Sequence, residues 1–324
     1  MLRVTRACRL SEQPEEARWL VSGLWAEQAV GIVGGEPKCC KSFLALDLAV
    51  SVASGTPALG RFPIGKPGRV ILYAAEDALT VVRHRLEGIA RSRQLDFASL
   101  DVGVITEPVV RLDLERDRLA LRETIERWRP RLLVLDPFVR LHRIDENAVA
   151  EVAPLLAYLR ELQRSFGAAV LLVHHARKGA SHVRAGQALR GSSELHAWGD
   201  SNLYLARKAT ALTLTIEHRA AASPAPLALE LAGASDAVTL RIVEPPSKPS
   251  EPRSIPIEER VTEALKAAGR PLSIRQLRAA CQVRTASLTG TLAALTKQGA
   301  IERTSAGYCI RTQPELPSMT ASLT

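Results

Sequence analysis

The sequence has few aromatic residues and no long apolar run. Phe, Trp and Tyr make up 4% of its 324 residues, which argues against a single-strand binding surface built from stacked bases. No apolar stretch approaches the roughly 18 residues of a membrane span. The N-terminal segment MLRVTRACRLSEQPEE has charges but no apolar core, so it is not a secretory signal. We therefore expect a cytoplasmic protein without a membrane partner.

The sequence also has no cysteine motif typical of a metal site or a redox-active disulfide. The five cysteines form no CxxC pair and no metal-ligand spacing with histidine, and an odd number in a cytoplasmic chain indicates free thiols. Acidic residues are in the minority, because 43 Lys and Arg stand against 34 Asp and Glu, a formal net charge of +9. That excess favours a polyanionic partner, with nucleic acid as the first candidate.

Most of the chain alternates short β-branched runs with helical stretches, which predicts an α/β fold on a mostly parallel sheet. The expected parallel strands are 30–33, 70–74, 102–106, 132–135 and 170–174, and the expected helices are 42–54, 78–93, 115–128 and 147–166. Further strands are expected at 203–205, 212–216, 227–231 and 238–243, where antiparallel strands extend one side of the sheet.

The chain divides into segments of different composition. Residues 1–243 form the expected α/β domain. Residues 244–256 contain five prolines and no apolar periodicity, so they predict a stiff linker. Residues 257–311 form a second, small domain, and the tail 312–324 is expected to be disordered. The length agrees with about two domains.

A phosphate-binding loop follows the first parallel strand. The segment from Gly35 to Ser42 matches G-x-x-x-x-G-K-[ST] at every position except Cys40, where the pattern has glycine. In such a loop backbone N–H groups cradle phosphates, the lysine neutralises them and the serine hydroxyl holds Mg²⁺. We expect ATP and Mg²⁺ here, with nucleotide contacts from Gly35, Glu36, Pro37, Lys38, Cys39, Cys40, Lys41, Ser42, Phe43 and the more distant Asp136.

Two cysteines lie within this loop. Cys39 and Cys40 sit at a helix N-terminus beside Lys38 and Lys41, an environment that favours thiolates and a redox-sensitive loop. The plainer interpretation is that both are small residues filling a tight turn.

Carboxylates end two other strands, at the edge where open α/β sheets bind ligands. VILYAAED ends in Glu76, which could polarise the attacking water, and Asp77, which is better placed to cap the following helix. Simple capping by both remains an alternative. RLLVLDPF ends in Asp136, which together with Ser42 is expected to support Mg²⁺.

A histidine pair ends the last parallel strand, in AAVLLVHHARKG. His174 or His175 could sense the γ-phosphate and pass its state to the next segment. A metal site would need a third ligand, and none lies at a suitable spacing.

The segment after the histidines, residues 176–191, is basic and rich in glycine. Its cations are suited to gripping the backbone of single-stranded DNA, although a solvated loop would have the same composition; they are Arg177, Lys178, Arg184 and Arg190.

The segments GEPKCCKS, YAAED, LLVLDPF and VHHARKG occur in the order and spacing of the RecA-like AAA family of RepA-type hexameric plasmid replicative helicases. The resemblance spans about residues 20–243. It implies Lys41 and Ser42 on phosphate and Mg²⁺, Glu76 as catalytic base, Asp136 on Mg²⁺, and His175 or His174 as the sensor. It also implies a homo-oligomeric ring, a hexamer in this family, with nucleotide sites between subunits.

In ring-forming ATPases a basic residue can reach the nucleotide of the neighbouring subunit. Arg219, at the exposed end of the alternating strand, is our candidate for this role in trans. Arg207 and Lys208 are rival candidates.

Residues 257–311 have the pattern of a winged helix-turn-helix domain, with three helices followed by a hairpin. Arg284, Thr285 and Ser287 begin the third helix and would enter the major groove of duplex DNA, with Arg303 or Arg311 on phosphate. Docking of a protein is the alternative.

Three functions fit these features. The first is a hexameric ATP-driven DNA translocase or helicase serving replication of a plasmid or mobile element. The second is an ATP-switched DNA-binding regulator or loader that unwinds nothing. The third, a filament-forming recombinase, is the weakest, because no convincing polymerisation segment precedes the core.

Overall fold

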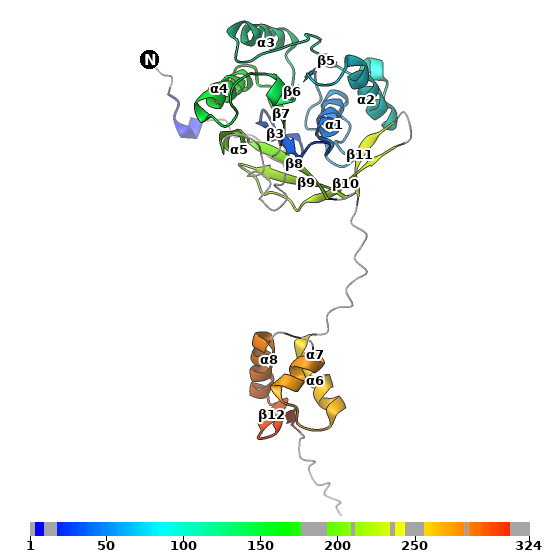
Figure 1. Ribbon diagram of the computed structural model, residues 1–324, viewed down its shortest axis with the longest axis vertical. Coiled ribbons are helices and arrows are strands. Elements are labelled where there is room, and N and C mark those ends of the chain that lie inside the picture. Colours follow the sequence, from blue (N-terminus) through cyan, green and yellow to red (C-terminus); the bar gives the residue numbers. More distant parts are fainter. Residues whose placement is uncertain are drawn as a thin grey trace, which may run out of the picture. The chain divides into compact units, whose positions relative to one another are not determined.

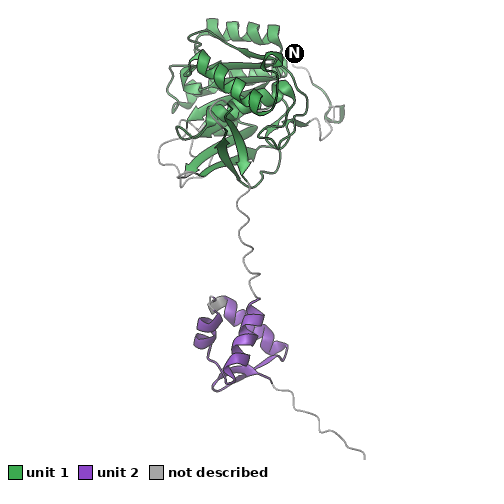
Figure 2. Cartoon of the chain, turned by 90° about the vertical axis from the view of Figure 1, so that its right-hand side faces the viewer, with its two compact units in different colours: residues 1–244 green, residues 245–324 purple. Residues whose placement is uncertain are grey.

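The protein is known from a computed structural model that describes residues 4–9, 18–175, 193–208, 211–233, 237–243, 256–281, 283 and 285–311. The chain forms two compact units, residues 1–244 and residues 245–324, and each is described by itself (Figure 2). In the described ranges, no helix combines the length and the apolar character needed to cross a bilayer.

A nine-stranded mixed sheet forms the centre of the larger unit, in the order β11-β10-β9-β8-β3-β7-β6-β4-β5. The strands from β8 to β5 in this order are parallel, and β9, β10 and β11 extend the β8 side in antiparallel fashion. The predicted α/β fold is therefore confirmed. The strands are β3 (Val30–Gly35), β4 (Val70–Ala74), β5 (Val102–Val104), β6 (Leu132–Asp136), β7 (Ala169–His175), β8 (Ser201–Lys208), β9 (Ala211–His218), β10 (Leu227–Ala232) and β11 (Thr239–Val243).

Helices cover both faces of this sheet, α1 and α2 on one and α3, α4 and α5 on the other (Figure 1). Successive strand residues point to opposite faces. Accordingly, Leu132 and Val134 of β6 belong to the core under α1, whereas Leu133 and Leu135 belong to the core under α4. The helices are α1 (Lys41–Ser54), α2 (Leu79–Ser92), α3 (Glu115–Trp128), α4 (Val149–Phe166) and α5 (Ser193–Trp198).

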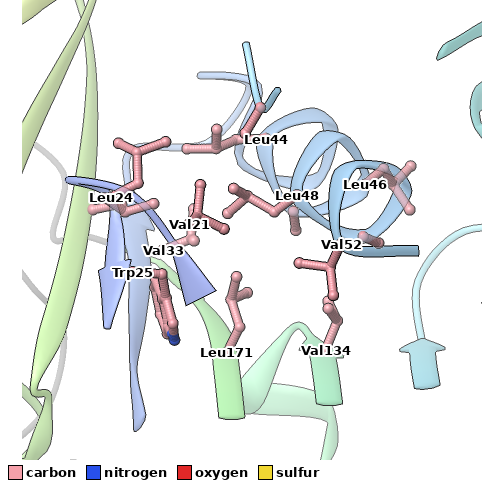
Figure 3. Close-up of a cluster of buried hydrophobic side chains, with 14 of the residues drawn as sticks. Val21, Leu24, Trp25, Val33, Leu44, Leu46, Leu48, Val52, Val134 and Leu171 are labelled. Atoms are coloured by element: carbon pink, nitrogen blue, oxygen red, sulfur yellow. The ribbon is translucent and has the colours of Figure 1, made fainter. Parts of the chain in front are cut away.

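Helix α1 is embedded in the first of these cores. Leu44, Leu48 and Val52 face Val134 of β6 and Leu171 of β7 (Figure 3). The helix ends at Gly55, whose left-handed backbone (φ 78°) lets its N–H bond the carbonyl of Ser51. This packing fixes the N-terminus of α1, and therefore the loop before it, against the parallel strands.

Some elements differ from the sequence-based expectation. The short hairpin of β1 (Trp19–Val21) and β2 (Trp25–Ala26) and the helix α5 were not predicted, and neither were the single-turn 3-10 helices Ala7–Arg9, Phe97–Ser99 and Phe138–Arg140. The expected cap of α2 is wrong: Ala78 occupies the cap position without a side-chain hydrogen bond, and the carboxylate of Asp77 pairs with Arg85 instead.

The smaller unit contains three helices and a hairpin: α6 (Ile257–Ala268), α7 (Ile274–Cys281), α8 (Thr285–Lys297), β12 (Ile301–Thr304) and β13 (Gly307–Ile310). Ser273 and Gln276 form a reciprocal cap at the start of α7, because Ser273 Oγ accepts from Gln276 N (3.3 Å) and Gln276 Oε1 from Ser273 N (2.9 Å). Paired backbone hydrogen bonds between Leu272 and Tyr308 join the hairpin to the helices. Gly299, two residues after α8, has a left-handed backbone (φ 74°).

Candidate nucleotide-binding site

The loop between β3 and α1 is held by close backbone packing. At Gly35 (φ 156°) an added Cβ would lie 2.3 Å from the carbonyl oxygen of Leu205 and 2.7 Å from Sγ of Cys39, so only glycine fits. Cys40, at the last position before α1, has a left-handed backbone (φ 65°). Glycine adopts this backbone conformation most readily. With a side chain at this position, the conformation lowers the stability of the fold by about 1 kcal/mol.

Lys41 is buried within the loop that it closes. Its ammonium donates to the carbonyls of Gly35 (3.0 Å) and Glu36 (2.8 Å) and lies 3.8 Å from Sγ of Cys39. Burial lowers the pKa of Lys41, against the opposing effect of Cys39 and Asp136. The loop carbonyls therefore hold this cation inside the cleft.

Three carboxylates lie opposite the loop, at the ends of β4 and β6. These strands pair in register at Ala74 and Asp136, which brings Glu76 and Asp77 beside Asp136. Burial raises the pKa of Asp136 to about 6, and Asp77 and Glu76 add to the rise, while a hydrogen bond from Ser42 and the charge of Lys41 oppose it. Three carboxylates are thus close together in this part of the cleft, and a bound cation would reduce the repulsion between them.

These groups line one cleft of about 340 Å³. Its walls come from the loop, from the ends of the parallel strands and from α2: Lys38, Cys39, Cys40, Lys41, Ser42, Phe43, Ala74, Glu76, Asp77, Arg85, Asp136, Val173 and His175. A hydroxyl and a buried carboxylate in mutual contact are ligands suited to Mg²⁺. Ser42 and Asp136 therefore fit the expected ion, and the loop fits a nucleotide's phosphates. Gly35, Glu36 and Pro37 belong to the loop but not to these walls.

Two arginines pair with carboxylates of the cleft, and no pattern in the sequence predicts either of them. Arg140 Nε donates to Glu76 Oε1 (2.8 Å), and both side chains are about half exposed. Arg85 pairs with Asp77 and lies over the Phe43 ring, 5.2 Å from its centroid. Neither residue belongs to a motif, and only the fold brings them to the site.

The histidine pair is divided between the two faces of the sheet. His175 lines the cleft on the α1 face, whereas His174 is buried on the opposite face beside Phe138. Of the two candidates for a phosphate sensor, only His175 is therefore in place to touch the nucleotide. Within the part of the chain that the structure covers, no group of three or more His, Cys, Asp or Glu could hold a metal ion by itself.

The candidates for a role in trans lie at opposite edges of the sheet. Arg219 follows β9 at the edge remote from the loop, where it pairs with Asp200 (3.2 Å) and donates to the carbonyl of Ala197. Arg207 lies at the end of β8 next to the loop, and its Nη2 donates to Sγ of Cys40 (3.2 Å). Lys208 ends the same strand.

The expected DNA contacts fall largely outside the described residues. Arg177, Lys178, Arg184, Arg190 and Arg284 are among those not described. Ser287 is exposed on α8, as a residue that contacts DNA would have to be.

One solved structure and one family model are similar to this chain. The crystal structure of the RadB recombinase is similar at 17% sequence identity, over 67% of this chain and 92% of that chain, with a TM-score of 0.49. A family model described as AAA domain matches residues 2–181, which is more than half of the chain. The match includes the loop, both carboxylate-bearing strands and the histidine pair. The chain therefore belongs to the AAA domain family of P-loop ATPases.

Proposed function

We propose that the protein hydrolyses ATP in the cleft described above and uses the energy to move along DNA. The observation that carries the first part is that one cleft gathers Lys41 and Ser42 from the loop with Glu76 and Asp136 from two neighbouring strand ends. These are the charges and ligands that phosphoryl transfer requires, because its catalysis depends on positioning and charge stabilisation.

Each residue has a distinct part in the proposed reaction. Lys41 would exchange the loop carbonyls for the β- and γ-phosphates, and Ser42 and Asp136 would hold Mg²⁺, whose charge would offset that of the phosphates. Glu76 orients the attacking water and accepts its proton. Arg140 bonds Oε1 of Glu76, and no hydrogen bond from another described residue occupies Oε2, which would face the water. His175 contacts the γ-phosphate.

The proposed assembly is a hexameric ring that translocates on or unwinds DNA during replication of a plasmid or mobile element. The net charge of +9, the basic segment 176–191 and the order of the four motifs support it. In such a ring a cation from the next subunit completes the site, and Arg207, Lys208 and Arg219 are the candidates.

We further propose that the smaller unit is a winged helix-turn-helix domain that binds duplex DNA through the start of α8. Its three helices, with a hairpin attached through Leu272 and Tyr308, support this assignment. Helix α8 contains no acidic residue, its Ser287 is exposed, and Arg284 precedes the helix in the sequence. Neither residue would repel phosphate.

A regulator or loader switched by ATP is the second candidate. The left-handed Cys40 with its bond to Arg207 favours it, because a side chain and a bound guanidinium at the loop could slow turnover.

Steady-state ATP hydrolysis with and without single-stranded DNA, with Lys41→Ala as the blank, separates the two candidates. The translocase predicts a stimulation of about tenfold or more, on the scale of about 1.4 kcal/mol of transition-state stabilisation. Hydrolysis that is indifferent to DNA favours the regulator. Deleting residues 257–324 should then abolish DNA binding by the regulator but leave most DNA-stimulated turnover of the translocase. A rate equal to that of Lys41→Ala contradicts the translocase and indicates that Cys40 leaves a nucleotide binder rather than a motor.

A further inference from the structure

Behind the cleft, a carboxylate lies between two buried imidazoles. Oε1 of Glu146 is 3.5 Å from Nε2 of His142 and 4.0 Å from Nδ1 of His174. Both histidine side chains are 1% exposed and that of Glu146 is 14% exposed. The three side chains are therefore packed together in a place shielded from water, where contacts between polar groups are stronger than in solvent.

The Phe138 ring fixes the geometry of the cluster. It meets both imidazoles edge-on, with centroids 4.5 Å from that of His142 and 5.9 Å from that of His174, and it is itself fully buried. The imidazoles therefore have little freedom to turn away from Glu146.

The cluster joins the segment after β6 to the end of β7, and each of these two strands supplies a residue to the nucleotide cleft. His142 and Glu146 lie in the segment that follows β6, the strand ending in Asp136. His174 precedes His175, and the pair is in register with Gly34 and Gly35 of β3 at the start of the phosphate loop. A shift of Glu146 would thus move the end of β7 relative to that loop.

The same cluster borders a second cavity. His142 lines a cavity of about 490 Å³ that it shares with Arg140, Arg143 and Glu76. Contacts made on that side of the molecule can therefore reach Glu146 and His174 through packed side chains, and they reach His175, whose side chain lies on the other face of the sheet, through the backbone of β7.

We propose that Glu146 is a positioning residue that acts through His174 to aim His175 at the γ-phosphate, and so sets how well the site distinguishes ATP from ADP. The inference rests on the proposed role of His175 as sensor. It adds to that role a residue that no sequence motif contains and that does not line the cleft.

The test compares the dissociation constants of ADP and of a non-hydrolysable ATP analogue for the full chain. For Glu146→Gln we expect an unchanged affinity for ADP, within about twofold, and a loss of about fivefold or more in the preference for the analogue, the usual scale of coupling between sites. Glu151→Gln is the matched control, because that exposed carboxylate in the first turn of α4 accepts a hydrogen bond from the nearby Asp145 N–H and lies outside the cluster.

A double variant tests the route. If Glu146 acts through His175, Glu146→Gln changes nothing further in a His175→Ala background. An unchanged preference in Glu146→Gln, or an equal loss with and without His175, overturns the proposal. If Glu146→Gln does not fold, Glu146→Asp keeps the charge at a shorter reach and is expected to lose preference in the same direction.

The outcome is separable from that of the proposed function. If the wild-type chain prefers the ATP analogue to ADP but does not hydrolyse ATP, the proposed activity is wrong. The role of Glu146 is then still decided by the comparison of dissociation constants. A wild-type chain that binds both nucleotides equally would overturn the sensor, and with it this inference.

Discussion

The guanidinium of Arg207 donates a hydrogen bond to the thiol of Cys40, with 3.2 Å between Nη2 and Sγ. This bond links the end of β8 to the last residue of the phosphate loop, where the usual pattern has glycine. The loop is therefore stabilised from outside at the position where its own backbone is strained.

The strain at Cys40 predicts that two small substitutions differ in their effect on the stability of the protein. Both Cys40→Gly and Cys40→Ala remove the bond to Arg207, but only glycine relieves the left-handed backbone. We expect the glycine variant to exceed the alanine variant in free energy of unfolding by about 1 kcal/mol. Urea unfolding of the two proteins measures the difference. An alanine variant of equal or greater stability would show that the backbone there is not left-handed.

The buried charge of Asp136 predicts a pH-dependent stability without nucleotide or metal. Its pKa of about 6 in the fold lies above the ordinary 3.8, so its contribution is fully present below about pH 4 and is lost as the pH rises through 6. At pH 7.5 we expect Asp136→Asn to be more stable than the wild type by up to about 3 kcal/mol. At pH 4 the two should be alike.

Asp113 supplies the control of opposite sign. The hydrogen bond from Arg111 lowers the pKa of Asp113, so its stabilisation is present at neutral pH and is lost on acidification. Asp113→Asn should therefore destabilise the protein at pH 7.5. A stabilisation by both substitutions, or by neither, would contradict the assignment for Asp136.

A buried ion pair joins α1 to the end of α2, and breaking it is expected to destabilise the protein strongly. Asp47 is 1% exposed and pairs with Arg93, which also bonds Ser51 (2.7 Å) and Thr56 (3.1 Å). Arg93→Met leaves the carboxylate buried without its cation and should cost about 3–5 kcal/mol.

The double variant Arg93→Met, Asp47→Leu should lose less stability than Arg93→Met alone, because it leaves no unpaired buried ion. Arg122→Met, which breaks an exposed pair with Glu161, is the comparison and should cost at most about 1 kcal/mol. Equal losses for the two single variants would refute the distinction between the buried and the exposed pair.

The sequence predicted the parallel core well because its strands carry unbroken apolar runs and its loops carry marked glycines and carboxylates. Leu132 to Asp136 is an example, and its strand begins and ends within one residue of the expectation. The hairpin β1–β2 escaped prediction because its strands are three and two residues long, too short for a period. Helix α5 has only six residues and follows a segment without apolar periodicity.

The residues of the candidate site could be predicted only where a sequence motif, with a fixed residue type at a fixed spacing, has a known chemical role. Lys41, Ser42 and Asp136 meet that condition. Arg85, Arg140 and Glu146 do not, because their partners are distant in sequence and only packing brings them together. The division of the histidine pair between two faces follows from strand alternation, and it shows that adjacent residues at one edge need not share a site.

The candidates for a cation in trans can be separated by mixing subunits. A subunit with Arg207→Ala keeps its loop, and one with Lys41→Ala keeps its cation. If Arg207 serves the neighbouring site, a mixture of the two inactive proteins should regain turnover, because some interfaces combine an intact loop with an intact arginine. The same mixtures made with Arg219→Ala and with Lys208→Ala test the other two candidates. Recovery with none of the three would argue against a shared site.

The role of Glu76 as the base in an ATP-binding cleft is the central claim, and Glu76→Gln tests it most directly. The variant should bind ATP with an unchanged dissociation constant and lose about a hundredfold or more in turnover, since general-base catalysis contributes on that scale. Asp77→Asn, one residue away and paired with Arg85, should keep most of the activity. A Glu76→Gln protein that turns over ATP at the wild-type rate, while Asp77→Asn does not, would contradict the account.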